Sequence, residues 1–274
     1  MEKEKIRCQV ITPMFCYGAD GQTPELRVPS LKGALRFWWR AIHPNLSLNE
    51  VKTKETEIFG GAGDNEAKKS SFLLQITNVK KNVQKISALP HKERSHRPKS
   101  ITPNSTFNII IRPESEVIKN LLLLTSIIGG IGARSRRGFG CFQIESIDDK
   151  EFNWDLNEDK LIEKINEINP NFEIGKEYER DYPYLQNVGI GNFFSDYNEL
   201  LKKIGRASHE FDTPYTGTAR NGRYASPIYV SVYKQNDKYY PIISTLKRTI
   251  NNANDHQAEE KKKNDFIEAI LGGA

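Results

Sequence analysis

Residues 129–140, GGIGARSRRGFG, combine five glycines and three arginines without an acid. Glycines let backbone amides approach an anion and take positive φ angles, and arginines supply forked donors that match phosphate. We therefore predict an anion-binding loop; the alternative is a flexible glycine loop whose arginines occur there by chance. The pattern GxxxxGK[ST] is absent and the loop follows a helical pattern, so neither a P-loop nor a dinucleotide-binding turn is indicated. The candidate binding residues are Gly129, Gly130, Gly132, Arg134, Arg136, Arg137 and Gly138.

A second basic group lies in residues 30–42, where Lys32, Arg36 and Arg40 recur every four residues. On a helix this spacing stacks the three side chains in one stripe, roughly 130° from the apolar seam of the same helix. Gly33 lies beside the stripe and costs a helix about 1 kcal/mol relative to alanine, which is explained if a ligand or another chain approaches there. The alternative is a solvated charged face with an incidental glycine.

Arginines and tyrosines are interleaved among small residues farther along the chain. Arg206 precedes this region, and Arg220 and Arg223 lie within it near Tyr215 and Tyr224. Rings that stack on bases, beside guanidinium groups that meet phosphates, are typical of single-stranded RNA recognition. We therefore predict RNA contacts at the three arginines; the alternative is that the tyrosines are core or strand residues.

The histidines show no spacing typical of a catalytic or metal site. His43, His91, His96, His209 and His256 form no HExxH motif, and the chain has no GxSxG or cysteine-centred motif. A loop histidine such as His91 or His96 could act as a general base in RNA cleavage, but solvation or a phosphate contact is the commoner role. We predict no catalytic residue, no metal site and no cofactor.

The composition is that of a soluble, mildly basic protein. The chain has 274 residues, is 37% hydrophobic and carries a formal net charge of +5. Basic residues gather in residues 80–99 and 129–140, whereas residues 145–181 are acidic, so one face can be basic. No apolar run approaches the length of a membrane helix, and three cysteines without a CxxC pair favour a reducing compartment. We predict a cytoplasmic protein that does not bind membranes.

The hydrophobic pattern predicts the elements that carry these groups. It indicates strands over residues 5–15, 71–79, 105–112 and 139–147, and helices over residues 30–42 and 113–128. Ser30 is the expected N-cap of the first helix, and residues 80–99 are an expected long exposed connection. The order strand, helix, strand, strand, helix, strand is that of ferredoxin-like and RRM-like folds.

That topology places the last strand antiparallel beside the first. Loop 129–140, loop 17–29 and the start of the first helix should therefore converge at one end of the sheet. After residue 148 the pattern is weaker, so the second half is either a degenerate copy of the same unit or an extension, and no internal repeat decides between them. The hydrophobic pattern of this half predicts helices over residues 159–168, 195–204 and 253–271, and hairpin strands over residues 228–233 and 238–243.

Two adjacent tryptophans in the first predicted helix should have different roles. Trp38 falls on the apolar seam with Leu31, Leu35 and Ile42, whereas Trp39 falls between the seam and the basic stripe. Large aromatic residues beside arginines are favoured at interfaces and as stacking platforms. We predict that Trp38 belongs to the core and that Trp39 contacts a partner or RNA.

Three segments together resemble the RAMP superfamily: PELRVPSLKGALRFWWRAI at residues 24–42, IFGGAG at residues 58–63 and IGGIGARSRRGFGCFQI at residues 128–144. Within it, the FWWR run and the ARSRRGFG loop are most similar to the first-numbered RAMP subunits of type III-B CRISPR (Cmr) effector complexes. Residues 221–233 resemble a later arginine-and-proline segment of those subunits. The resemblance is strong over the first half of the chain and patchy beyond it.

The resemblance implies an α+β protein of two tandem ferredoxin-like (RRM-like) units. Residues 1–147 would form the first, with the basic helix and the glycine-rich loop, and residues 148–274 a degenerate second unit. It also implies a non-catalytic subunit that holds the 3′ portion of guide crRNA, single-stranded target RNA or both, beside other RAMP subunits of the Cmr complex. The guide-binding loop of such proteins falls on residues 129–140.

Two other functions remain open at this point. A RAMP-type endoribonuclease that processes CRISPR transcripts would share the scaffold and the loop, and His43, His91 or His96 beside the loop would favour it. A structural adaptor that only docks a partner would have no affinity for RNA.

Overall fold

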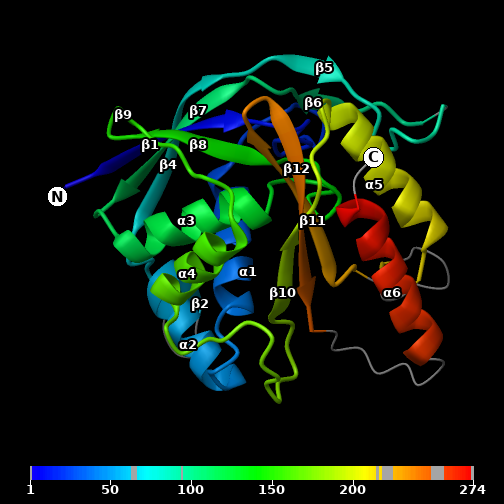
Figure 1. Cartoon of the computed structure of the whole chain (residues 1–274). Helices are drawn as coiled ribbons and strands as arrows, with labels where there is room; N and C mark the ends of the chain where they lie inside the picture. The colour runs from blue at the N-terminus through cyan, green and yellow to red at the C-terminus, as the bar shows by residue number, and fades with distance from the viewer. Residues whose placement is uncertain are drawn as a thin grey trace.

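The first half of the chain forms a five-stranded antiparallel sheet with the order β4-β7-β1-β8-β9 (Figure 1). The strands are β1 (Glu4–Val10), β4 (Leu73–Lys80), β7 (Thr106–Arg112), β8 (Phe142–Ile147) and β9 (Lys150–Glu151). The computed structural model describes residues 2–62, 67–93, 95–213, 216–217, 225–247 and 256–272. The predicted pairing of the last strand with the first is confirmed, because Gln9 of β1 lies opposite Gln143 of β8.

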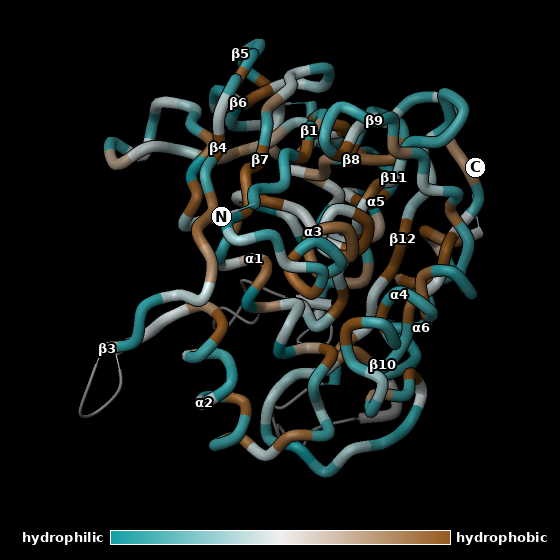
Figure 2. The backbone as a smooth tube through the Cα atoms, turned by 90° about the vertical axis from the view of Figure 1, so that its left-hand side faces the viewer, coloured by the Kyte–Doolittle hydropathy of each residue, from teal (hydrophilic) through white to brown (hydrophobic). Residues whose placement is uncertain are grey.

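Helices α1 (Val28–Ala41) and α3 (Glu116–Ile128) pack against this sheet and against each other. With β1, β4, β7 and β8 they reproduce the predicted order strand, helix, strand, strand, helix, strand. The α+β ferredoxin-like prediction is therefore confirmed for this half of the chain. Figure 2 shows the apolar residues along β7 and α3 inside the molecule and hydrophilic residues along the peripheral loops.

Helix α1 forms because its apolar residues recur on one side. Leu31, Leu35 and Ile42 are fully buried, and Trp38 is 1% exposed, so the predicted seam is confirmed. The predicted N-cap is wrong: Arg27 is the N-cap, and Ser30 lies inside the first turn. A proline is tolerated in the first turn of a helix, because its missing N–H would have no partner there. Pro29 therefore allows the helix to begin two residues before Ser30.

The second half of the chain builds a three-stranded antiparallel sheet with the order β10-β12-β11. Its elements are β10 (Leu185–Ile190), α5 (Tyr197–Glu210), β11 (Ile228–Gln235), β12 (Lys238–Leu246) and α6 (His256–Leu271). The sequence predicted both helices and the hairpin but missed β10. That this half is a degenerate ferredoxin-like unit, with a boundary at residue 147, stays a prediction.

Two further helices complete the fold. Helix α4 (Glu158–Ile168), which the sequence predicted, packs on α3. Helix α2 (Leu48–Phe59), which it did not predict, packs on α1. A capping box starts α2: Ser47 accepts from the Glu50 amide, and the Glu50 carboxylate accepts from the Ser47 amide. No described helix combines the length and apolar character needed to cross a membrane.

The described part of the basic segment of residues 80–99 has no buried residue, as an exposed connection should, but it is partly ordered into strands. Its ends pair as β5 (Val83–Lys85) and β6 (Lys99–Ile101), and Ile86 and Ala88 pack against the apolar cluster beneath α5. The apolar side chains within this basic run give it a face to bury. The remaining short strands, β2 (Gly61–Ala62) and β3 (Ala67–Lys68), form a hairpin after α2.

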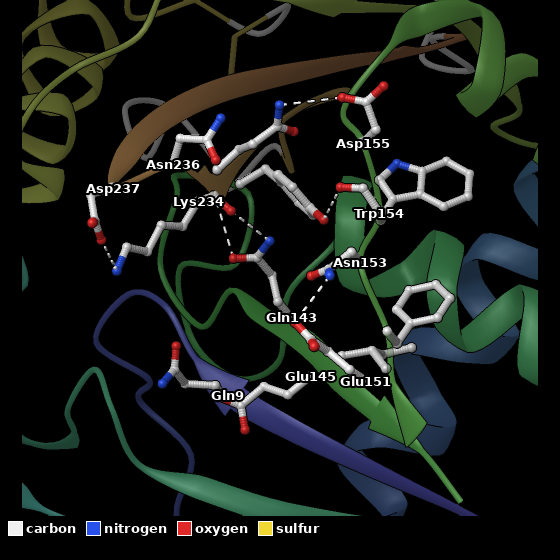
Figure 3. A pocket seen from close by; sticks show the side chains of 14 residues that line it. Gln9, Gln143, Glu145, Glu151, Asn153, Trp154, Asp155, Lys234, Asn236 and Asp237 are labelled. Carbon is white, nitrogen blue, oxygen red and sulfur yellow. Dashed lines mark hydrogen bonds and ion pairs between the residues drawn. The ribbon is translucent and has the colours of Figure 1, made fainter. Parts of the chain in front are cut away.

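Side chains join the two sheets where β8 approaches β11 (Figure 3). The Gln143 amide donates to the backbone carbonyl of Lys234 at 3.0 Å and accepts from the Lys234 amide at 3.1 Å. Nearby, the Tyr233 hydroxyl donates to the backbone carbonyl of Trp154 at 3.0 Å. Tyr233 and Tyr229 of the second sheet also belong to the main apolar cluster of the first. The main apolar cluster therefore includes residues of both sheets, whereas a second cluster joins α5 and α6 to β11 and β12.

Candidate functional site

Of the three segments predicted to converge at one end of the sheet, the glycine-rich loop and the start of α1 do meet, as the shared lining of one groove shows. The Ala133 amide donates to the carbonyl of Phe15, and the Gly140 amide donates to the carbonyl of Pro13, each at 2.9 Å. The glycine-rich loop thus lies against the segment that leads into α1. Between the loop and α1 is a groove of about 230 Å³. We call it the α1 groove; it is lined by Ser30, Gly33, Ala34, Phe37, Trp38, Gly130, Ile131, Gly132, Ser135 and Tyr229.

Gly33 is open toward the α1 groove. A Cβ atom added at Gly33 would meet no described atom within 4 Å. The packing of the described chain therefore does not require glycine here, although glycine weakens a helix by about 1 kcal/mol relative to alanine. That a ligand backbone approaches Gly33 stays a prediction.

Aromatic rings form part of the groove wall. The ring centroids of Phe37 and Tyr229 are 5.0 Å apart, and those of Trp38 and Tyr229 are also 5.0 Å apart. The Arg136 guanidinium lies 4.7 Å from the centroid of Tyr229. Burial raises the pKa of Tyr229, so its hydroxyl is neutral at physiological pH. Tyr229 and Trp38 are only 7% and 1% exposed, so Phe37 is the accessible ring of this wall, and Arg136 lies beside the groove. A ring beside a cation is a combination that binds single-stranded nucleic acid.

Several glycines of the loop are required by the fold itself. A Cβ atom at Gly129 would lie 2.5 Å from Trp38 Nε1, and one at Gly132, which has a φ of 94°, would lie 2.5 Å from the carbonyl of Phe15. Gly138 packs against Leu201 and would clash in the same way. These glycines let the loop pass between α1 and α5, so their number is not by itself a sign of anion binding.

Arg137 does not fit the predicted phosphate contact. Its Nη1 donates to the carbonyls of Ile228 at 3.0 Å and Arg136 at 2.9 Å, and its Nη2 donates to the carbonyl of Thr216. Burial lowers the pKa of Arg137 to about 10, so it stays charged at neutral pH. The prediction for Arg137 is corrected: its donors join the loop to Ile228 of β11 and to Thr216, because these carbonyls lie within reach.

Arg136 and Arg134 keep capacity for a ligand. Arg136 Nη1 donates to the carbonyl of Ser226 at 2.7 Å, which holds the guanidinium over Tyr229. Arg134 has a φ of 63°, and its guanidinium lies 5.8 Å from the ring of Phe139. Its Nε is buried without a hydrogen-bond partner among the described residues, and burial lowers the pKa of this side chain.

The basic stripe of α1 faces α2 and is partly neutralised there. Arg40 Nη1 lies 2.7 Å from Glu55 Oε1, and Arg36 Nη1 lies 3.8 Å from the same oxygen. Arg36 also donates to the carbonyls of Phe59 and Gly60, and Lys32 Nζ lies 5.1 Å from the ring centroid of Phe72. The side chains of Arg36 and Arg40 remain 33% and 39% exposed, so each can still reach a phosphate.

Trp39 is not at the edge of the helix. It is 2% exposed, its ring stacks on His43 with centroids 4.2 Å apart, and its edge meets Phe59. The prediction that Trp39 offers a ring to a partner is therefore wrong. Phe59 is the last residue of α2, and α2 packs on the side of α1 that carries Trp39. From helical spacing alone, that side was expected to be free for a partner.

The third predicted basic group is only partly described. Arg206 lies on α5 and is exposed. Arg220 and Arg223 lie outside the described residues, as do Tyr215 and Tyr224. Their predicted RNA contacts stay predictions.

One of the histidines lies near the glycine-rich loop. Arg134 and Arg206 are both close enough to lower the pKa of His91, and its ring centroid is 6.0 Å from that of His209. His43, in contrast, is buried in the core, and burial lowers its pKa to about 4. His96 is exposed on the basic segment.

Sequence reasoning missed Phe37 and His209 as candidate site residues. Phe37 precedes the tryptophan pair and could have been found, because it lies one helical turn after Gly33. His209 had no such signal, since 118 residues separate it from His91.

A second cavity, of about 800 Å³, lies between the sheets but has the wrong charge for RNA (Figure 3). Its lining includes the carboxylates of Glu145, Glu151, Asp155 and Asp237, against the single lysine Lys234. Lys234 is itself paired with Asp237 at 2.8 Å. An acid-rich cavity repels a polyanion, so the α1 groove is the better candidate.

Comparison with known proteins agrees with the fold and the loop. A family model described as the RAMP superfamily matches residues 7–143. The CRISPR system Cmr subunit Cmr1-2 of Pyrococcus furiosus is 27% identical over 177 residues, 51% of this chain and 93% of that protein. Subunit Cmr1-1 of the same organism is 30% identical over 138 residues, 44% of this chain and 41% of that protein. The chain thus matches less than half the length of Cmr1-1.

Solved structures show the same fold. The crystal structure of apo Cmr1 from Pyrococcus furiosus matches with a TM-score of 0.65 and 18% identity, over 98% of this chain and 96% of that one. A chain in the cryo-EM structure of the type III-B Cmr-beta complex bound to cognate target RNA matches with a TM-score of 0.62 and 10% identity, over 98% and 99% of the two chains. Since the family model spans half of the sequence, including α1 and the glycine-rich loop, the chain belongs to the RAMP superfamily.

Proposed function

We propose that this chain is a non-catalytic RNA-binding subunit of a type III-B CRISPR (Cmr) effector complex. It holds the 3′ portion of guide crRNA, target RNA or both, beside other RAMP subunits, in the cytoplasm. The two Pyrococcus furiosus relatives are named as Cmr subunits, which supports the assembly. Three free, buried cysteines are consistent with a reducing compartment.

The α1 groove carries the RNA-binding part of this proposal. It combines an open glycine at Gly33, the exposed backbone of Gly132 and an aromatic wall that includes Phe37 and Tyr229. Arg136 lies against that wall, and Arg40 is near enough to lower the pKa of Tyr229. A nucleotide backbone can pass over the glycines while a base stacks on a ring and a phosphate meets a guanidinium.

Binding of single-stranded RNA by the purified chain tests the proposal. Affinity should fall steeply as salt rises, because contacts to phosphate release counterions. Arg136→Gln should weaken binding to unrelated sequences alike and reduce the salt slope by about one. Arg7→Gln is the matched control, since Arg7 is exposed on β1 and paired with Glu145 at 2.8 Å. Binding that is absent, or unaffected by salt, would contradict the proposal.

Assembly needs a separate measurement. Co-expression with the neighbouring genes of its operon should yield a complex that contains this chain together with other RAMP subunits and bound RNA. Sequencing that RNA should return CRISPR spacer and repeat sequence. A complex that forms without RNA, or RNA of random sequence, would favour the structural adaptor instead.

A RAMP-type endoribonuclease is the second candidate, and the place of His91 favours it. His91 faces His209 and lies near Arg134 of the glycine-rich loop, an arrangement in which an imidazole could accept a 2′-hydroxyl proton. Incubation with a labelled CRISPR repeat transcript separates the two functions. Discrete products that vanish in His91→Ala would establish the enzyme, whereas intact transcript bound with normal affinity supports the non-catalytic subunit.

A further inference from the structure

Two histidines from distant parts of the sequence face each other on the side of the glycine-rich loop opposite the α1 groove. His91 lies in the segment between β5 and β6, and His209 lies near the end of α5. Their ring centroids are 6.0 Å apart, and the ring planes differ by 30°. Figure 1 shows the segment after β5, in cyan, reaching α5, in yellow.

The His91 ring is pressed against the backbone of α5. A Cβ atom at Gly205 would lie 2.3 Å from His91 Nδ1, a distance that no side chain can accept. Glycine at position 205 therefore allows the ring to lie on the helix. This close approach costs α5 some stability, because glycine is a poor helix former.

Three buried nitrogens at this place lack partners. His91 Nδ1, His91 Nε2 and Arg134 Nε have no hydrogen-bond partner among the described residues. Folded proteins pair nearly all their buried donors and acceptors, and an absent ligand is one reason for an exception. One nitrogen of a neutral imidazole donates and the other accepts, so His91 and Arg134 Nε each offer one unpaired N–H, which indicates a group that accepts hydrogen bonds.

Positive charge converges on the same point from three elements. Lys92 on the basic segment, Arg134 on the loop and Arg206 on α5 all act with burial to lower the pKa of His91. Arg206 also lines a cavity of about 620 Å³ along α5, where Lys202 and Lys203 face the carboxylates of Glu199 and Glu210. Around His91 itself the neutral ring lies among Lys92, Arg134 and Arg206, and this excess of cations favours an anionic ligand.

We propose that His91, Arg134, Arg206 and His209 form a binding site for a phosphate group of RNA. The site rests on the proposed RNA-binding function and extends it to a second contact. Arg206 and His209 are exposed and meet the phosphate first. A local shift that exposes the buried N–H groups of His91 and Arg134 then lets them donate to the remaining phosphate oxygens.

The position of this phosphate site fits an RNA strand that leaves the α1 groove. Gly130 and Gly132 line the groove, whereas Arg134, two residues on, acts on His91 on the other side of the loop. An RNA backbone that crosses the loop therefore passes from one site to the other. The loop contributes to both contacts without a change in its own fold.

Histidine resonances of the full chain give a direct test. The five histidines are labelled with ¹³C at Cε1, assigned with single substitutions and titrated with inorganic phosphate at constant ionic strength. The resonances of His91 and His209 should shift together with one dissociation constant, and those of His43, His96 and His256 should not. Equal shifts at all five, or none at His91 and His209, would overturn the site.

Two variants separate charge from position. Arg206→Gln should weaken phosphate binding about tenfold, the effect of losing one charge-assisted contact. Gly205→Ala keeps every charge but displaces the His91 ring, and it should weaken phosphate binding as well. Lys52→Gln, on the exposed side of α2, is the matched control and should bind phosphate normally. Normal binding by both Arg206→Gln and Gly205→Ala would overturn the site.

Short RNAs distinguish the source of the phosphate. If an oligonucleotide with hydroxyl ends shifts His91 and His209, the site takes a backbone phosphodiester; if only an oligonucleotide with a terminal phosphate does so, the site takes an end. RNA that binds with neither resonance shifted would overturn the site while leaving RNA binding intact. A phosphate-binding chain without RNA affinity would instead contradict the proposed function.

Discussion

The two tryptophans of α1 lie in one core, although they point to different partners. Trp38 packs on Tyr229 and Gly129, and Trp39 packs on His43 and Phe59. Trp39→Ala should therefore lower the free energy of unfolding by about 3–5 kcal/mol, as should Trp38→Ala, because each leaves a large cavity. Urea unfolding of both variants checks this. A Trp39→Ala protein as stable as the wild type would show that its ring is exposed in solution.

His43 should make the stability of the protein depend on pH. Its Nδ1 donates to the carbonyl of Trp39 at 2.6 Å, and burial lowers its pKa from 6.5 to about 4. Between these values the unfolded chain binds a proton that the folded chain does not. The contribution of the neutral ring is full above pH 6.5 and is lost as the pH falls toward 4, with a total on the order of 3 kcal/mol.

The measurement compares unfolding free energies at pH 7.5 and pH 5. Wild type and His96→Gln, which changes an exposed histidine, should lose more stability over this interval than His43→Gln. If all three lose the same amount, His43 is not the group that titrates.

For single residues, the sequence predicted which side chains of α1 face the core better than it predicted which distant residues they contact. The seam of Leu31, Leu35 and Trp38 follows from helical spacing alone, and the structure confirms it. The burial of Trp39 depends on α2, and the role of Arg137 depends on the carbonyls of Thr216 and Ile228, which lie 79 and 91 residues away in sequence. Spacing along one helix or loop contains no information about such distant contacts.

The pairing of α1 with α2 sets how much positive charge α1 presents. Glu55 is the acid that faces both Arg36 and Arg40, and its side chain is 14% exposed. Glu55→Gln should raise RNA affinity about threefold at low salt, because a repelling carboxylate near the phosphates is removed. The gain should shrink as salt screens the charges. Filter binding at two salt concentrations measures both effects.

Glu57→Gln is the matched control on the same helix, since the Glu57 side chain is 54% exposed and lies 3.7 Å from Lys68 rather than near the stripe. It should leave affinity unchanged. Equal effects of the two substitutions would mean that RNA responds to total charge and not to the stripe.

The sequence predicted the order of the main helices and strands, but it missed some of the elements themselves. Strand alternation and helical spacing in residues 1–147 predicted all six elements of the ferredoxin-like unit, because each buries one face against the same core. The α2 helix was missed although Ser47 and Glu50 form a capping box, since a charged helix with few apolar residues gives a weak periodic pattern. Strand β10 was missed because LQNVGI has no regular alternation.

In the whole molecule, the glycine-rich loop contacts elements of both halves of the chain. It contacts α1 on one side through Gly129 and α5 on the other through Gly138, and Arg137 joins it to β11. The sequence predicted the convergence on α1 because strand pairing dictates it. It did not predict the contact with α5, which depends on how the second sheet packs on the first. In the proposed function, RNA lies in the α1 groove, on one side of this loop.

The most direct test is RNA affinity after the groove is filled from Gly33. Gly33→Glu introduces a charged side chain at the groove, and its Cβ atom meets no described atom within 4 Å. It should not destabilise α1, because glutamate is a better helix former than glycine. Thr53→Glu adds the same charge on the exposed side of α2. Gly33→Glu should bind single-stranded RNA at least about tenfold more weakly than Thr53→Glu, with equal or higher melting temperature. Equal affinity of the two variants would contradict the placement of RNA in the α1 groove.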